Sequence, residues 1–191
     1  MAKLLEIGGT GFLSYGNIKI DLSKDGLVQL LGINGVGKTN IISLLTEALF
    51  SKNPRGYAKT DLLNRNGKYQ KSTIYAKFAD NSDNEYVATT VRTKTTAKVT
   101  LTKNGADVSG HTSKQTFDLI QSILGMDYEL FLQYTYQSSR FPTEFLLATP
   151  KARRDYLANL LDLDAITSDV AAVSKKMIEL KCDVTFADAK L

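Results

Sequence analysis

The sequence is poor in the residues that build disulfide frameworks and metal centres. It has one cysteine, Cys182, one histidine, His111, and no tryptophan. A single cysteine excludes an internal disulfide and suits a reducing compartment. One cysteine and one histidine also argue against a zinc site, which takes three or four protein ligands. A catalytic triad would have to rest on His111, which lies in a polar, turn-like stretch and is interpreted as an exposed loop residue.

Long apolar runs are missing as well. No stretch approaches the roughly 20 apolar residues that cross a bilayer. The start of the chain, MAKLLEIGG, lacks the apolar core and the cleavage site of a secretory signal. With 191 residues, 43% hydrophobic and 23% charged, the composition is that of one globular domain with room for an extension. These features together predict a cytoplasmic protein.

The net charge of +4 conceals a basic segment. Between residues 51 and 71 a single acid, Asp61, accompanies six basic residues: Lys52, Arg55, Lys59, Arg65, Lys68 and Lys71. Such a segment can face phosphate groups or can be a solvated loop. Composition leaves both interpretations open.

Hydrophobic periodicity divides the chain into strands and helices. Residues 3–23 have the pattern of two short strands joined by a glycine-rich bend, and residues 26–32, GLVQLLG, that of a strand buried on both faces. A broad apolar stripe predicts a helix from Lys38 that ends at KNPRG. Period-two alternation over residues 72–109, with the hairpin signal Asn104-Gly105, predicts an antiparallel meander.

The stretch GINGVGKT, residues 32–39, has the spacing G-x-x-x-x-G-K-[ST] of a phosphate-binding loop. Its glycines allow successive N–H groups to curl around β-phosphate oxygens, and the dipole of the following helix adds positive potential. Lys38 places a charge on the β- and γ-phosphates, and the Thr39 hydroxyl ligates Mg²⁺. The loop is predicted to bind ATP or GTP with Mg²⁺ through Asn34, Gly35, Val36, Gly37, Lys38, Thr39 and Asn40.

Half of the hydrolytic machinery is missing. A P-loop enzyme usually needs an apolar run that ends in an acid, which holds the metal and orients the attacking water. The candidates SILGMD and ANLLDLD are interrupted by glycine or belong to helical patterns, and no LSGG-like signature is present. The sequence therefore predicts nucleotide binding with negligible turnover by the chain alone.

The last part of the chain carries helical signals. Helical spacing returns at Ser113, and Thr149-Pro150 is a good helix start, an N-cap residue followed by proline at the first helical position. Further on, apolar residues alternate at spacings of three and four, the pattern of a coiled-coil seam: Leu163, Ile166, Val170, Val173, Met177, Leu180, Val184, Ala187 and Leu191. A seam needs a partner helix. The alternative is an amphipathic helix that packs on its own domain.

These motifs together resemble the N-terminal lobe of SMC-like ABC ATPases. The closest similarity is to the SbcC-type ATPase subunit of the double-strand-break repair nuclease, phage-encoded versions included, and it runs over nearly the whole chain. Besides the phosphate loop it rests on YQSSRFPTEFLLATPKARRDYLANLL, where Gln137 falls at the family's Q-loop glutamine. The family pattern that follows is matched by Phe145-Leu146, Ala148, Pro150, Arg153-Arg154, Leu157 and Leu160.

The resemblance implies an α/β fold, a P-loop ABC-ATPase N-lobe over residues 1–161 with a mixed sheet around the P-loop helix and an antiparallel meander. Residues 162–191 would be the root of a coiled coil. Lys38 and Gln137 would be catalytic, and Thr39 with Gln137 would complete the Mg²⁺ shell. Family members often have Asn-Phe-Arg where this chain has GFL at residues 11–13, so a basic nucleotide contact is not expected there.

The resemblance also implies partners. In the family a C-terminal lobe supplies the missing acid and signature, and two molecules sandwich two ATPs. An SbcD-type nuclease would dock at the coil root, around residues 165–185, and the complex would couple ATP hydrolysis to the processing of double-stranded DNA ends in repair and recombination, in the host cytoplasm for a phage protein. Sequence-independent DNA contacts are expected from basic residues after the P-loop helix and in the hairpin: Arg55, Lys59, Arg65, Lys98 and Lys103.

Other classes of protein share part of this pattern. A RecF-type or chromosome-condensing ATPase lobe, acting as a DNA clamp without a nuclease, is the nearest alternative. A nucleotide kinase or small GTPase would contain its own acid motif, and a transporter ATPase would lack the seam. A purely structural coiled-coil module would show no affinity for ATP.

Overall fold

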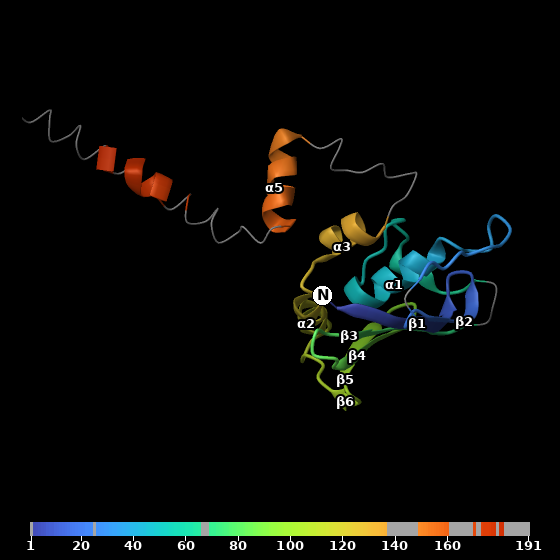
Figure 1. Cartoon of the computed structure of the whole chain (residues 1–191). Helices are drawn as coiled ribbons and strands as arrows, with labels where there is room; N and C mark the ends of the chain where they lie inside the picture. Colours follow the sequence, from blue (N-terminus) through green and yellow to red (C-terminus); the bar gives the residue numbers. More distant parts are fainter. Residues whose placement is uncertain are drawn as a thin grey trace, which may run out of the picture. The chain divides into compact units, whose positions relative to one another are not determined.

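A computed structural model gives the three-dimensional structure of the chain. It describes residues 2–24, 26–65, 69–136, 149–160, 170, 173–178 and 180–181. The chain divides into two compact units, Met1–Tyr136 and Gln137–Leu191. Figure 1 draws the helices and strands of the first unit from blue to yellow and the described helices of the second in orange and red.

The first unit is built on a six-stranded sheet with the strand order β2-β1-β3-β4-β5-β6. Its pairings are all antiparallel, so the predicted two-strand start and meander are confirmed. Asn104 and Gly105 join the last two strands with φ of 49° and 86°, the left-handed conformations of a tight hairpin turn. The strands are β1 (Lys3–Phe12), β2 (Tyr15–Asp21), β3 (Ser72–Ala79), β4 (Glu85–Arg92), β5 (Ala97–Lys103) and β6 (Ala106–Asp107).

One face of the sheet carries the core. Along β3 and β4 every second side chain is buried, and the strand register brings these positions together, for example Ala76 opposite Ala88 and Phe78 opposite Tyr86. The two aromatic rings stack with centroids 5.5 Å apart. α1 (Asn40–Phe50) covers this face and contacts β1, β3 and β4, as Figure 1 shows. Nine of its 11 residues are buried, which explains the broad apolar stripe in its sequence.

Two further helices complete the core of the first unit. α2 (Ser113–Leu124), the helix expected from Ser113, begins with a capping box in which Thr112 and Gln115 bond each other's backbone N–H groups. α3 (Tyr128–Thr135) packs Phe131 against Phe50 of α1, with ring centroids 5.1 Å apart. The C-terminal end of α1 is thus enclosed by aromatic side chains.

The segment after α1 returns to the β1–β2 hairpin. It includes the short 3-10 helix η1 (Lys59–Leu62). The N–H of Leu13 donates to the Leu62 carbonyl and the N–H of Asn64 donates to the Gly11 carbonyl, both over 2.9 Å. Because Leu62 is fully buried, these bonds fix the tip of the hairpin to the core.

The strand predicted over residues 26–32 is wrong. Residues 26–33 contain no strand and their side chains are exposed, Leu27 fully and Leu31 to 81%. A strand needs a neighbour for its backbone N–H and C=O groups, and none of β1 to β6 pairs with this segment. The α/β class and the helix after the phosphate loop are confirmed, but the described sheet has no parallel part.

The second unit contains α5 (Pro150–Leu160), which begins at the proline that predicted a helix start. The described residues between 170 and 181 are helical as well. The seam side chains among them, Val170, Val173, Met177 and Leu180, are 53% to 62% exposed. The other seam residues and the predicted boundary between residues 161 and 162 lie outside the described residues, so the coiled coil stays a prediction. No helix among the described residues is long and apolar enough to span a membrane.

Candidate nucleotide site

The phosphate loop leads directly into α1. Gly35 and Gly37 have φ of 87° and 107°, in the region that favours glycine and excludes most other residues. The N–H of Asn40 donates to the Gly37 carbonyl over 2.7 Å, so the first turn of the helix starts from the last glycine of the loop. The sequence motif and the positive end of a helix therefore meet as predicted, and they form a site for an anion.

Lys38 lies within the curve of the loop. Its ammonium donates to the carbonyls of Gly32 and Ile33, over 2.5 and 2.9 Å. These bonds hold the charge close to the backbone that would surround a phosphate. Both bonds are exposed, so the ammonium can exchange the two carbonyls for phosphate oxygens at little cost.

Thr39 and Asn40 take different roles at the start of α1. Thr39 is the N-cap residue, yet its side chain makes no capping hydrogen bond, which leaves its hydroxyl for a metal ion. The Asn40 side chain is buried and turned toward the β1–β2 hairpin, where its Nδ2 donates to the Ser14 Oγ over 3.1 Å. Its Oδ1 accepts from the Arg55 guanidinium over 3.3 Å. Gln137, the other predicted metal ligand, lies outside the described residues.

The hairpin makes a second contact with the loop that the sequence did not reveal. The Tyr15 hydroxyl donates to the Gly37 carbonyl over 2.5 Å. Burial raises the pKa of Tyr15 above its ordinary value of 10, so its hydroxyl stays protonated and a donor at neutral pH. The two residues are 22 positions apart, and no periodicity or spacing connects them.

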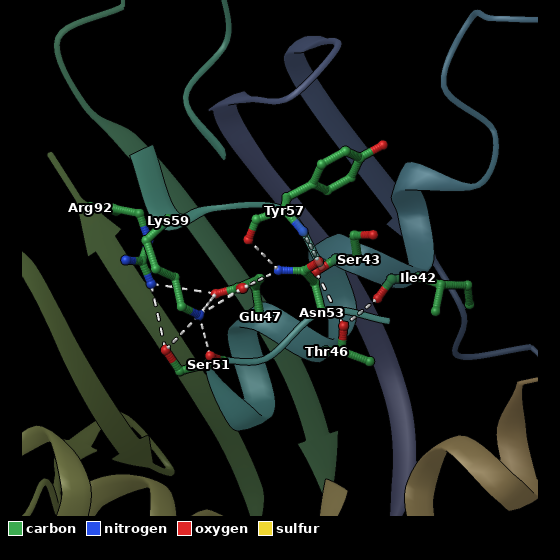
Figure 2. A network of polar contacts seen from close by, with 9 residues as sticks. All are labelled: Ile42, Ser43, Thr46, Glu47, Ser51, Asn53, Tyr57, Lys59 and Arg92. Carbon is green, nitrogen blue, oxygen red and sulfur yellow. Dashed lines mark hydrogen bonds and ion pairs between the residues drawn. The ribbon is translucent and has the colours of Figure 1, made fainter. Parts of the chain in front are cut away.

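A buried carboxylate lies at the other end of α1. Glu47 is fully buried, and Figure 2 shows three donors converging on it from different segments. Lys59 is 2.8 Å from its Oε1, Asn53 donates to the same oxygen over 3.0 Å, and Arg92 of β4 is 3.4 Å from its Oε2. Lys59 also donates to the backbone carbonyl of Ser51. Glu47 therefore joins the helix, the following loop and the sheet.

The sequence offered only a weak signal for this network, because Glu47 is simply the one charged residue of α1. Glu47 is the one carboxylate of α1, and it is held by two cations. Both of its oxygens are therefore engaged by protein donors. The described residues contain no cluster of three or more His, Cys, Asp or Glu that could hold a metal ion.

The structure assigns different surroundings to the five basic residues proposed to contact DNA. Lys59 is engaged with Glu47, and Arg55 bonds Asn40 and lies over the Tyr57 ring, 5.6 Å from its centroid. Arg65 forms a surface ion pair with Asp61. Lys98 and Lys103 are five positions apart on β5. Because successive side chains of a strand point to opposite faces, the two lysines lie on opposite faces of the sheet.

The residues present fit a magnesium nucleotide. The loop has two glycines in left-handed conformations, a lysine ammonium within its curve and an uncapped threonine hydroxyl at the helix start. Lys38 and the loop amides would hold the β- and γ-phosphates, Thr39 would ligate Mg²⁺, and the metal would neutralise phosphate charge. Fold and site together define a P-loop nucleotide-binding lobe.

Comparison with known proteins extends this assignment. The family model described as "AAA domain" matches residues 7–182, and the chain belongs to this family. It is 40% identical over 151 residues to the probable exonuclease subunit 2 of Escherichia phage T5, a match that covers 78% of this chain and 24% of that protein. It is 24% identical over 179 residues to exonuclease subunit 2 of Enterobacteria phage T4, covering 92% of this chain and 31% of that one.

A solved structure shows the same fold. The recombination mediator protein RecF, in a structure with ATP, superimposes with a TM-score of 0.50 at 16% identity, covering 61% of this chain and 30% of RecF. The chain therefore shares the fold of the RecF ATPase lobe. The chain spans between about a quarter and a third of the length of its curated relatives.

Proposed function

We propose that this chain is the ATP-binding half of an SMC-like ATPase that works with a nuclease subunit in processing DNA ends for repair and recombination. The arrangement of Lys38, Thr39 and the loop glycines ahead of α1 carries the proposal. The exonuclease names of the phage relatives support the nuclease context. The alternative, a RecF-type clamp without a nuclease, would use the same site.

The exposed apolar segment before the phosphate loop supports the proposal that a second lobe completes the ATPase. Leu27, Val28, Leu30, Leu31 and Ile33 are between 49% and 100% exposed, and the segment has no strand partner in the part of the chain that the structure describes. Exposed apolar groups in such a row are typical of an interface. We propose that strands of a C-terminal lobe pair with residues 26–33, bring the catalytic acid and the signature, and complete the parallel part of the sheet.

The expected behaviour of the chain is binding without turnover. Titration calorimetry should show one Mg-ATP site, and steady-state phosphate release should stay at background, because positioning and charge stabilisation at the γ-phosphate supply most of phosphoryl-transfer catalysis. Addition of EDTA should weaken the binding, since Thr39 contributes through the metal. Multiple turnover by this chain that disappears in Thr39→Ala would show that it contains its own catalytic acid.

The nuclease partner and the homodimer are part of the same proposal. The exposed stripe Val170, Val173, Met177 and Leu180 would pack on a returning coiled-coil helix, and the outer face of residues 165–185 would hold an SbcD-type nuclease. ATP would bring two copies together at their nucleotide sites. Retention of nuclease binding and ATP-dependent DNA degradation by a full-length Val170→Asp/Met177→Asp variant would exclude this role for the helix.

DNA binding is proposed through phosphate contacts rather than base contacts. Arg65 and Lys98 are the best candidates, because Arg65 is held by a surface ion pair, which is worth little, and Lys98 is exposed. Arg55 and Lys103 remain candidates, whereas Lys59 already neutralises Glu47. Arg65→Gln and Lys98→Gln should each lower the salt dependence of duplex binding by about 0.9 in the log–log slope for each lost contact. Lys24→Gln, an exposed lysine elsewhere, is the control, and an unchanged slope in the first two variants would identify them as solvated.

A further inference from the structure

The tip of the β1–β2 hairpin holds the last glycine of the phosphate loop from two sides. Tyr15 Oη donates to the Gly37 carbonyl over 2.5 Å. A Cβ added to Gly37 would overlap the Ser14 hydroxyl, so the Ser14 side chain comes closer to the loop than any residue but glycine would allow. Asn40 then ties Ser14 to the first turn of α1. The hairpin therefore contacts the loop at the point where it becomes a helix.

The hydrogen bond to Gly37 fixes the orientation of a whole peptide group. The carbonyl oxygen of Gly37 accepts from two donors, the Tyr15 hydroxyl and the Asn40 N–H. In a planar trans peptide the C=O and the following N–H point in opposite directions. Holding the carbonyl against the hairpin and the helix therefore turns the Lys38 N–H to the opposite side, toward the concave face of the loop. That N–H belongs to the row of donors that would receive a phosphate.

The hairpin is a firm support for this contact. Phe12 is 1% exposed and bridges to Leu63, and the backbone bonds of Gly11 and Leu13 tie the turn to the buried end of η1. The loop itself has no comparable support on its other side, because residues 27–36 are exposed and form no strand. The hydroxyl of a side chain on the anchored hairpin thus restrains the backbone that would bind the ligand.

We propose that Tyr15 is a positioning residue for nucleotide binding, which presets the 37–38 peptide so that the Lys38 N–H faces the phosphates. The inference rests on the proposed binding of Mg-ATP at this loop. Ser14 and Asn40 set the approach of the hairpin, and Tyr15 sets the direction of the carbonyl. The residue does not touch the nucleotide; it acts through Gly37.

Two measurements on the whole chain test the proposal. Tyr15→Phe removes only the hydroxyl, and a lost neutral hydrogen bond corresponds to about a 2- to 12-fold change in equilibrium constant. The Kd for Mg-ATP by calorimetry should rise within that range. In the ligand-free chain, amide hydrogen exchange of Asn40, whose N–H donates to the same carbonyl, should accelerate several-fold. A residue that only stabilises the fold would not produce this local change.

Tyr75→Phe is the matched control. The Tyr75 hydroxyl donates to Glu6 over 2.6 Å within the sheet, away from the loop, so its loss should leave both the Kd and the Asn40 exchange unchanged. Equal Kd and equal exchange in wild type and Tyr15→Phe would overturn the role of Tyr15. A wild-type chain that fails to bind Mg-ATP, while Tyr15→Phe still accelerates Asn40 exchange, would instead overturn the nucleotide assignment and leave Tyr15 as a structural contact.

Discussion

Lys38→Ala should lose measurable Mg-ATP binding while the chain stays folded. The ammonium is the charge that lies within the curve of the loop, and hydrogen bonds to charged groups contribute about 1.5–3 kcal/mol each. One such bond to the phosphates corresponds to roughly a 10- to 150-fold weaker Kd, and two would take binding beyond the range of calorimetry. The side chain bonds only exposed carbonyls in the free chain, so the free energy of unfolding should change by less than about 0.5 kcal/mol.

The measurement is a titration of wild type and variant with Mg-ATP, with a thermal melt of each. Lys94→Ala is the control, because Lys94 is an exposed lysine in the turn between β4 and β5, and removing it tests whether any loss follows from net charge alone. Equal affinity of Lys38→Ala and wild type would remove the loop from the nucleotide site. A cooperative melt at the wild-type temperature is needed to attribute the loss to binding.

Glu47→Gln should strongly destabilise this chain. The carboxylate is fully buried and compensates Lys59 and Arg92. The Lys59 side chain is 46% exposed and can turn to water, whereas that of Arg92 is 10% exposed and would keep an unpaired charge in the interior. Breaking a buried pair by removing one partner costs about 3–5 kcal/mol. The free energy of unfolding in urea should fall by that amount.

A double-mutant cycle separates the charge from the packing. Arg92→Met leaves Glu47 paired with Lys59 at 2.8 Å and should cost less than Glu47→Gln. The double variant Glu47→Leu/Arg92→Met should be more stable than Glu47→Leu alone. The reason is that Arg92→Met removes the buried charge that Glu47→Leu leaves unpaired. Arg65→Ala, which breaks a surface pair, should change stability by about 1 kcal/mol or less. If Glu47→Gln were as stable as wild type, the network would have no structural role.

The network also bears on the function of the loop after α1. Lys59 and Asn53 hold residues 51–59 to the end of the helix, and Arg55 from the same segment reaches Asn40 at its beginning. Loss of Glu47 is therefore expected to loosen the contacts on Asn40 as well. By this expectation the buried carboxylate would support the proposed nucleotide site through the contacts along α1.

The sequence by itself determined the parts of this protein that depend on near neighbours. The spacing of GINGVGKT indicated the phosphate loop, because its glycines, lysine and threonine are neighbours in the sequence and act together in one short loop. The structure gives Gly35 and Gly37 the left-handed conformations that the motif requires. Period-two alternation and Asn104-Gly105 indicated the meander in the same local way. The motif pattern also indicated an ATP-binding lobe, which the match to the AAA-domain family over residues 7–182 bears out, and RecF shares the fold.

Tertiary structure decided what depends on distant partners. Residues 26–32 have the composition of a buried strand, but pairing is not a local property, and without a neighbour the segment stays exposed. The sequence marked Lys59 as a candidate for DNA, and only the fold shows it paired with Glu47. Tyr15 has no sequence signal because its partner Gly37 is 22 residues away, and only the folded hairpin brings the hydroxyl to the loop, where a single long-range hydrogen bond fixes the direction of the peptide.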